Sequence, residues 1–374
     1  MNSKINILFL VEGFGMGGVA KANISMINRI DKNKFNVHVL HYKEGILMGD
    51  LTDDIVISKL DYKAKLISLS TYFCIIKIID YIKKNDIDVI HSMAVTTYVV
   101  GAIAAHFTNI NHIRTQPNFI RRHEKLNTKT LKLLPFEKWT HKYITYQYAS
   151  AKDLNLAGVD MSKIETFRGF SKAEDFLYFN DIVDIRGELN IPKESKIILA
   201  VHRMVEKKGY ETFIDMIPHI VKKYKNVTFL LVGDGPLRKK FEDRVKTLGV
   251  SEYVRFTGFR KDLANIIKQI DFGVYPLADT AAMSTVIRAG KVLITKKNSS
   301  MDEYILDGET GYLVPEEKPE VYAKYALILL QDEEKLREME NKQKQYVISN
   351  FDGVKNMRRL EEVFIDLCRN PKEK

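Results

Sequence analysis

The sequence of 374 residues has little cysteine and no long apolar run. Its two cysteines, Cys74 and Cys368, lie far apart, so we expect no disulfide framework and a reducing, cytoplasmic location. No window offers the run of about eighteen uncharged apolar residues that a membrane-spanning helix requires. The first apolar segment, residues 5–11, is short, is followed by Glu12 and lacks a small-residue cleavage site. We therefore interpret it as a core strand and not as a signal peptide.

Acidic residues are in the minority, with 48 aspartates and glutamates against 58 lysines and arginines and a formal charge of +10. This balance is compatible with nucleic acid, an anionic membrane surface or an anionic small substrate as partner. The sequence has no zinc-ligand spacing, no mixed aromatic and basic pattern typical of RNA-binding modules, and no helix-turn-helix signal. We therefore expect no nucleic-acid partner.

Apolar, strand-like segments alternate with amphipathic, helix-like segments along most of the chain. Because hairpin signals are missing, the alternation predicts an α/β fold with parallel sheets and helices on both faces. The chain exceeds what one hydrophobic core usually organises, and near residues 171–194 the apolar content falls as in a linker. The expected boundaries are residues 1–172 for an N-terminal domain, 173–350 for a C-terminal domain and 351–374 for a last helix.

The segment with the most specific chemistry lies at residues 197–210. An apolar run that ends at Val201 is followed by Arg203 and Lys208, and Gly209 breaks the loop before an amphipathic segment. In open α/β sheets, ligands bind where the carboxyl ends of strands meet the following loops. Two cations at such a place favour the binding of a diphosphate, and two solvated loop charges are the alternative.

Further strands and glycine turns follow this loop, at residues 227–237, 254–259, 272–276, 291–295 and 307–314. In this order, the segments resemble the nucleotide-sugar-binding half of the retaining GT-B glycosyltransferases, in particular family 4. The resemblance extends over essentially the whole chain. Its most specific parts are the loop with Arg203 and Lys208, the glycine turn at 232–236 and the string at 307–314.

The resemblance implies a GT-B fold, with two Rossmann-like domains that face each other across a cleft and a last helix that crosses back to the N-terminal domain. It implies retaining transfer of a hexose-type sugar from a UDP- or GDP-sugar to a hydroxyl, in the synthesis of a cell-surface polysaccharide or glycoconjugate. Arg203 and Lys208 would stabilise the charge that develops on the β-phosphate. We expect no metal or other cofactor, and we interpret Asp86-Ile87-Asp88 as a solvated cap of the next strand.

Two positions in the N-terminal half bear on the acceptor side of the site. His91 matches a histidine in the family's Asp-Val-Ile-His string, which implies a catalytic position in the cleft; a partly buried histidine with one hydrogen bond is the alternative. The family's second histidine has no counterpart, because Arg114-Thr115-Gln116 stands in its place. We therefore count Arg114 among the acceptor-side residues.

The glycine-rich loop at residues 13–18 follows the first strand. Its spacing does not match the dinucleotide fingerprint G-x-G-x-x-G, and a tight structural turn is a second alternative. The resemblance implies instead that amides near Gly17 and Gly18 face the donor phosphate. The other donor-binding residues that it implies are Gly233, Gly258 and Phe259 around the base and Glu303 at the ribose.

The largest departure from the family concerns two glutamates, separated by seven residues, that hold the donor sugar and the ribose. Counted back from Gly290, Thr285 stands where the second glutamate is expected, and only Asp279 could replace the first. A hydroxyl accepts a hydrogen bond more weakly than a carboxylate does. Two other functions therefore stay open: a catalytically silent GT-B partner or chaperone protein, and a GT-B nucleotide-sugar epimerase.

Residues 121–139 mix basic side chains with leucine, phenylalanine and Trp139, the one tryptophan of the chain. This mixture suits the interface of an anionic bilayer, and a plain solvated surface is the alternative. We assign Arg121, Arg122 and Lys125 to acceptor or membrane contacts. The expected partners are a nucleotide sugar, a glycan or lipid-linked acceptor, and the inner face of the cell membrane.

Overall fold

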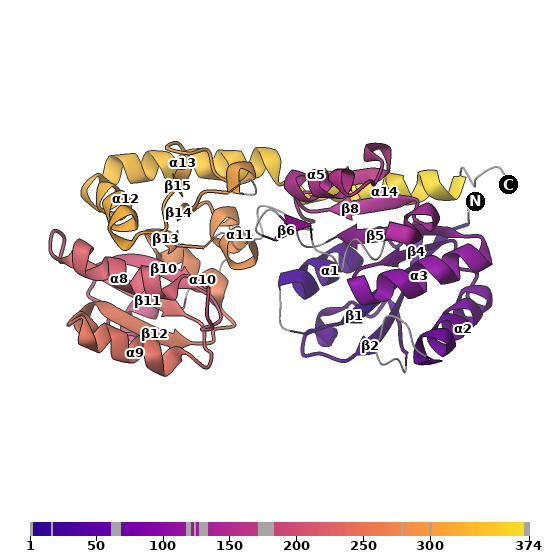
Figure 1. Ribbon diagram of the computed structural model, residues 1–374, viewed down its shortest axis with the longest axis horizontal. Coiled ribbons are helices and arrows are strands. Elements are labelled where there is room, and N and C mark those ends of the chain that lie inside the picture. Colours follow the sequence, from indigo (N-terminus) through magenta and orange to yellow (C-terminus); the bar gives the residue numbers. More distant parts are fainter. Residues whose placement is uncertain are drawn as a thin grey trace. The chain divides into compact units, whose positions relative to one another are not determined.

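The computed structural model describes residues 3–15, 18–60, 69–116, 121–122, 125–126, 134–170, 183–277, 280–298 and 301–369. The chain forms two compact units, of which the first comprises Met1–Ser171 and Asp352–Lys374 and the second Lys172–Phe351. Each unit has its own large parallel sheet (Figure 1).

The sheet of the first unit has seven parallel strands in the order β3-β2-β1-β4-β5-β8-β9. They are β1 (Ile5–Gly13), β2 (Phe35–Lys43), β3 (Val56–Lys59), β4 (Val89–Ser92), β5 (Asn111–Gln116), β8 (Lys142–Thr145) and β9 (Ile164–Thr166). Within β1, Ile7, Leu8 and Phe9 are fully buried. A strand covered on both faces is apolar without alternation, which explains the continuous apolar run at the start of the sequence.

Helices cover both faces of this sheet. On one face lie α1 (Gly18–Arg29) and α14 (Gly353–Arg369), the last helix of the chain. On the other face lie α2 (Leu69–Lys84) and α3 (Val95–Thr108). The remaining elements are α5 (Tyr148–Leu156), the short helices η1 (Met48–Asp50), η2 (Leu134–Trp139) and η3 (Met161–Lys163), and the hairpin of β6 (Arg121–Arg122) and β7 (Lys125–Leu126).

The second unit has a six-stranded parallel sheet in the order β12-β11-β10-β13-β14-β15. Its strands are β10 (Lys196–Val201), β11 (Val227–Val232), β12 (Val254–Gly258), β13 (Phe272–Tyr275), β14 (Val292–Lys296) and β15 (Gly311–Val314). The predicted α/β architecture with parallel sheets is thus confirmed in both units.

Helices also cover both faces of the second sheet. On one face lie α8 (Tyr210–Val221), α9 (Arg238–Thr247) and α12 (Pro319–Gln331). On the other lie α10 (Leu263–Gln269), α11 (Thr280–Arg288) and the end of α13 (Glu333–Asn350). Short helices complete the unit: α7 (Ile185–Glu188), η4 (Ser251–Tyr253) and η5 (Met301–Glu303).

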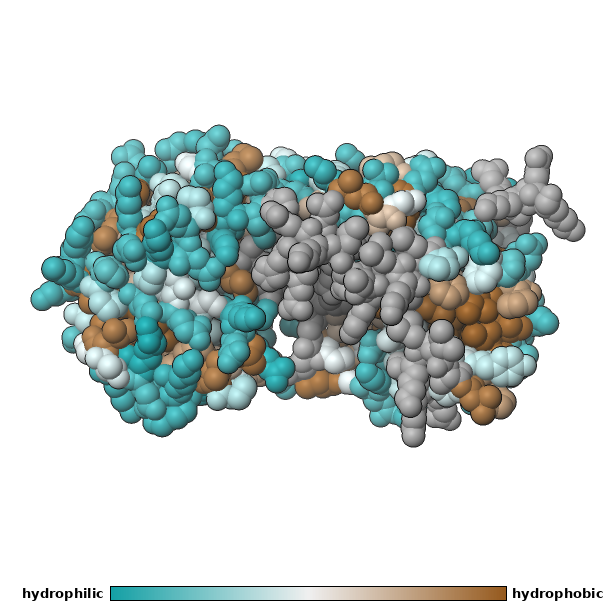
Figure 2. All heavy atoms as spheres, viewed as in Figure 1, coloured by the Kyte–Doolittle hydropathy of each residue, from teal (hydrophilic) through white to brown (hydrophobic). Residues whose placement is uncertain are grey.

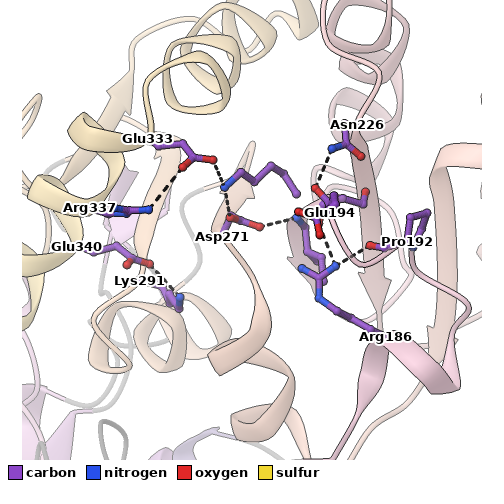
Figure 3. Close-up of polar contacts among 12 residues, drawn as sticks. Arg186, Pro192, Glu194, Asn226, Asp271, Lys291, Glu333, Arg337 and Glu340 are labelled. Carbon is purple, nitrogen blue, oxygen red and sulfur yellow. Dashed lines mark hydrogen bonds and ion pairs between the residues drawn. The ribbon is translucent and has the colours of Figure 1, made fainter.

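At the amino edge of the second sheet, where its strands begin, lysines are paired with acids (Figure 3). Lys196 Nζ lies 3.4 Å from Asp271 Oδ1 and 2.7 Å from Glu333 Oε1. Lys291 Nζ lies 2.9 Å from Glu340 Oε1. Because both glutamates belong to α13, these ion pairs fasten α13 to the sheet. These two lysines are therefore engaged in holding the fold together.

Among the residues that the structure describes, no helix combines the length and the apolar character needed to cross a membrane. The same residues contain no cluster of three or more histidine, cysteine, aspartate or glutamate side chains arranged to hold a metal ion.

Candidate functional site

The cationic loop, residues 202–209, connects β10 to α8 at the carboxyl edge of the second sheet. Arg203 is exposed and Lys208 is partly buried. Two residues turn the chain sharply, because φ is +61° at Lys207 and +76° at Gly209. A positive φ is easy for glycine and costly for lysine, and such strain concentrates at functional sites. The turn keeps the loop short and leaves both predicted cations at this edge.

Tyr210, the first residue of α8, holds the cationic loop in place. Its side chain is 1% exposed. The hydroxyl accepts a hydrogen bond from the backbone N–H of His202 at 2.9 Å, and it lies within donating distance of the carbonyl oxygens of His202 at 3.0 Å and Val232 at 2.9 Å. Burial raises the pKa of Tyr210, so the hydroxyl keeps its proton. One side chain thus joins the ends of β10 and β11 to the start of α8.

Two glycines after β11 let the neighbouring turn approach the cationic loop backbone to backbone. His202 N donates to Val232 O at 3.1 Å, and Met204 N donates to Asp234 O at 2.9 Å. A Cβ atom on Gly233 would overlap the carbonyl oxygen of His202, and one on Gly235 would overlap that of Met204. Gly233, which is predicted to shape the base pocket, also allows the close packing that fixes the cationic loop.

The end of β12 joins the same assembly. Gly233 N donates to Gly258 O at 2.8 Å, and Gly258 has φ of +71°. Phe259, the next residue, is 55% exposed. An exposed aromatic ring at this edge has the flat apolar surface on which a nucleotide base can stack.

The loop after β13 also contacts the cationic loop. A Cβ atom on Gly209 would lie 3.2 Å from the carbonyl carbon of Pro276, so the two backbones touch. The chain then continues through Asp279, which lies outside the described residues, into α11. Thr285 lies in the second turn of α11 and is partly buried.

Glu303 and the string at residues 307–314 follow β14. Glu303 is partly buried, and its carbonyl oxygen accepts a hydrogen bond from Tyr346 of α13 at 3.0 Å. In the string, Asp307 Oδ1 accepts from Leu313 N at 2.9 Å, and Thr310 Oγ1 accepts from Leu306 N at 2.9 Å. These bonds form a turn before β15, so the string that carried part of the resemblance has a structural role.

In the first unit, a pocket of about 370 Å³ lies at the carboxyl edge of the sheet. It is lined by Val11, Glu12, Gly13, Gly15, Ala20, Asn23, Lys43, Glu44, Met93 and Ala94. Glu12 Oε1 lies 2.5 Å from Lys43 Nζ, and Glu12 Oε2 accepts from Thr96 Oγ1 at 3.3 Å. Asn23 is 3% exposed, and its Oδ1 has no hydrogen-bond partner among the described residues. Asn23 therefore leaves an unpartnered, buried acceptor behind the wall of this pocket.

The glycine-rich loop borders this pocket through Gly13 and Gly15. Gly17 lies outside the described residues, and the backbone of Gly18 begins α1. The N-terminus of α1 is therefore at the carboxyl edge of the sheet, where its amides carry partial positive charge.

His91 requires a correction. Its side chain is fully buried, its Nε2 lies 2.7 Å from Thr115 Oγ1, and its ring packs 5.3 Å from that of Phe9 and 5.9 Å from that of Phe364, measured between centroids. Burial lowers the pKa of His91 to about 3, so the ring is neutral. A ring enclosed by β1 and α14 has no surface for a substrate, and the catalytic role predicted for His91 does not fit.

Arg114 requires a second correction, because it is 2% exposed. Its guanidinium lies 4.0 Å from the centroid of the Tyr98 ring and 5.8 Å from that of Tyr143, and Nη2 donates to Gln116 Oε1 at 2.6 Å. Burial lowers the pKa of Arg114. The side chain is a core cation between two tyrosine rings and not a surface contact for acceptor or membrane.

The structure describes only the backbone of Arg121, Arg122 and Lys125, which form the hairpin β6–β7. Their predicted contacts lie outside the described side chains. Trp139 stacks on His106 of α3, with 4.6 Å between ring centroids and 13° between planes. The ring is therefore engaged within the first unit.

Sequence reasoning missed Tyr210 and Asn23. The position of Tyr210 directly after the glycine of the cationic motif was the available signal, yet only the tertiary structure shows which backbone groups its hydroxyl reaches. Asn23 stands among apolar residues of a helix-like segment, and a lone polar residue on such a face was its signal.

Comparison with known proteins gives two family matches. The family described as "Glycosyl transferases group 1" matches residues 181–346, and the one described as "Glycosyl transferase 4-like" matches residues 7–115. The first match lies within the second unit and the second within the first unit.

Similar proteins include the UDP-Gal:α-D-GlcNAc-diphosphoundecaprenol α-1,3-galactosyltransferase of Escherichia coli, which is 21% identical with 99% of both chains aligned. The N-acetyl-α-D-glucosaminyl L-malate synthase of Bacillus anthracis is 26% identical, and that match spans 53% of each chain. Among solved structures, Anabaena HepE in complex with UDP and glucose matches with a TM-score of 0.81 and 18% identity, over 96% of this chain and 99% of HepE.

Proposed function

Because the chain belongs to the group 1 glycosyltransferases, family 4 of the retaining GT-B enzymes, we propose that it transfers a sugar from a UDP-sugar to a hydroxyl of a glycan or lipid-linked acceptor. The predicted family, GT-B fold and glycosyltransferase activity are confirmed by the family matches, the relatives and the shared fold. Choice of UDP as nucleotide rests on the UDP complexes of HepE.

The observation that carries this proposal is the fixed cationic loop. Arg203 and Lys208 follow β10 at the carboxyl edge, where parallel sheets bind ligands. Tyr210 and Gly233 fix the backbone on which both cations stand. When the bond between sugar and β-phosphate breaks, negative charge develops on the phosphate. Cations held in advance stabilise that charge without the cost of reorganising at the moment of reaction.

The rest of the donor site is assigned by position. Phe259 offers its exposed ring to the uracil, beside Gly258, and Glu303 is assigned to the ribose. Thr285 and Asp279 replace the family's two glutamates toward the sugar and ribose hydroxyls. The amides near Gly17 and Gly18 are assigned to the phosphates, together with the N-terminus of α1.

The acceptor site is assigned to the pocket of the first unit. The partly exposed carboxylate of Glu12 is an acceptor for hydroxyl protons, so the pocket suits a polyhydroxylated group such as a sugar. The E. coli relative is named for an acceptor linked to diphosphoundecaprenol, which supports a lipid-linked acceptor here.

A thermal-shift series with UDP-sugars, GDP-sugars, UDP and GDP tests the donor. A ligand that binds only the native state raises the unfolding midpoint. At a hundredfold excess over Kd, it adds about 2.7 kcal/mol to the free energy of unfolding. We expect a rise with the uracil nucleotides. A rise with guanine nucleotides alone would contradict the choice of UDP, and no rise with either would contradict the donor site.

Thr285 in place of a glutamate favours one second candidate, a catalytically silent partner of another glycosyltransferase. The same samples separate the two functions when they are incubated with a UDP-sugar and a membrane extract that contains lipid-linked acceptors. Transfer of radiolabelled sugar supports the enzyme, whereas UDP-sugar binding without transfer or hydrolysis supports the silent partner.

A further inference from the structure

Helix α2 of the first unit carries large apolar side chains on its outer face. Leu69 is 75% exposed, Tyr72 60%, Phe73 54% and Ile76 37%. Residues three, four and seven positions apart lie on one face of a helix, so these four form a continuous surface, here named the α2 stripe. Figure 2 shows hydrophobic residues gathered over α2 and α3. Contiguous exposed apolar surface marks an interaction site, whereas scattered single residues do not.

The fold does not require the α2 stripe. The inner face of α2 already supplies the core with Cys74, Ile78 and Ile82, which are at most 3% exposed. Polar side chains at the stripe positions would leave that packing intact. An apolar face that the core does not use is explained by a partner outside the unit.

The second half of α2 continues the same surface with cations. Lys77, Lys83 and Lys84 are exposed, and Asp80 is the one acidic residue of the helix. Aromatic and aliphatic side chains next to lysines are the combination that enters the interface of an anionic bilayer. The charge of +10 on the whole chain acts in the same direction.

The location of the stripe fits a lipid-linked substrate. Helix α2 ends shortly before β4 begins, and its 16 residues span about 24 Å back along the sheet. Its first turn, with Leu69 and Tyr72, is therefore at the carboxyl edge of the first sheet. The pocket assigned to the acceptor lies at that edge.

We propose that the α2 stripe docks on an anionic lipid bilayer, with Tyr72 and Phe73 in the interface and the lysines on the headgroups. Sequence pattern alone favoured residues 121–139 for this contact, but Trp139 is stacked on His106 inside the unit. Docking is independent of the donor site, so each can fail without the other.

Co-sedimentation of the full chain with vesicles of phosphatidylcholine and phosphatidylglycerol tests the proposal. The test variant is Tyr72→Ser/Phe73→Ser. The matched control is Phe107→Ser, because Phe107 is 70% exposed but lies in the last turn of α3, at the amino edge of the sheet and away from the first turn of α2. We expect the double variant to bind about tenfold more weakly. A tenfold change in affinity corresponds to about 1.4 kcal/mol, which the loss of two aromatic rings from the bilayer interface readily accounts for. Phe107→Ser should bind like the unchanged protein.

Binding should also fall in pure phosphatidylcholine and in Lys83→Gln/Lys84→Gln, because both changes remove the electrostatic attraction. Equal binding of Tyr72→Ser/Phe73→Ser and the unchanged protein would overturn the proposal, and so would absence of binding to anionic vesicles. A lipid-free dimer in sedimentation velocity that the double variant abolishes would also overturn it, since a second copy would then cover the stripe. UDP binding, measured in parallel, reports on the proposed function separately.

Discussion

The two units place basic residues near the ends of their parallel strands in opposite surroundings. In the second unit, Arg203 lies two residues beyond β10 and is exposed. In the first unit, His91 and Arg114 lie inside β4 and β5 and are at most 2% exposed. A side chain inside a parallel strand points to a face that helices cover, whereas one beyond the strand stays at the edge. A candidate ligand contact must therefore be sought after the strand ends.

The largest expected effect is a loss of activity when an exposed cation of the second unit is removed, compared with a loss of stability when the buried Arg114 is removed. Arg203→Ala should lower kcat/KM about a hundredfold, roughly 3 kcal/mol of transition-state stabilisation, with little change in the unfolding midpoint. Lys208→Ala should lower it to a similar extent. Arg114→Ala should instead lower the midpoint, because it empties a space between two tyrosine rings. Transfer assays and thermal unfolding of the three variants measure both effects. Near-normal turnover of Arg203→Ala would contradict the role assigned to Arg203 in catalysis.

The next effect concerns the backbone that holds Arg203. Gly233→Ala should displace His202 and reduce transfer on the order of tenfold, since small misplacement of a catalytic group is costly. Gly249→Ala is the matched control, because Gly249 also has a positive φ, +67°, and a Cβ there meets no atom within 4 Å. Both variants carry the strain of alanine at positive φ, but only Gly233→Ala should lose activity. Equal activities would show that the close approach is unimportant.

The stability of the protein at acid pH tests whether the histidines of the first unit are buried. Burial lowers the pKa of His91 to about 3 and that of His112 well below its ordinary 6.5. In the unfolded chain these histidines bind protons near pH 6.5, whereas in the folded chain they stay neutral to a much lower pH. Their contribution to the free energy of unfolding is therefore fully present above pH 6.5 and is lost as the pH falls toward 3. Between pH 7 and pH 5 the contribution of His91 should lower the free energy of unfolding by about 2 kcal/mol, and His112 should act in the same direction. In urea unfolding, His91→Gln should show a shallower decrease, and an unchanged pH dependence would contradict the burial.

Tyr210→Phe should have the smallest effect. It leaves the carbonyl oxygen of His202 without its hydroxyl partner, at a cost of about 1–2 kcal/mol in unfolding free energy. Because the cationic loop keeps its other backbone bonds, transfer should fall only severalfold. A loss of activity as large as that of Arg203→Ala would mean that Tyr210 itself contacts the substrate.

The same comparison explains what the sequence could and could not predict. Strand, loop and helix at residues 197–221 follow from local apolar spacing and Gly209, so the place of Arg203 was predictable. The enclosure of His91 was not, because Phe364 comes from the last helix and no local pattern announces that contact. The hydroxyl of Tyr210 likewise contacts backbone groups that only the fold brings near, and the burial of Asn23 depends on tertiary packing in the same way.

Calorimetric titration with UDP and with uridine measures whether the cationic loop binds the diphosphate of a uracil nucleotide. The unchanged protein should bind UDP far more tightly than uridine, since charged hydrogen bonds contribute about 1.5–3 kcal/mol each. In Arg203→Ala/Lys208→Ala, uridine affinity should stay the same and the advantage of UDP should largely disappear. If the double variant keeps the full advantage of UDP over uridine, the diphosphate binds elsewhere and Arg203 and Lys208 do not hold it.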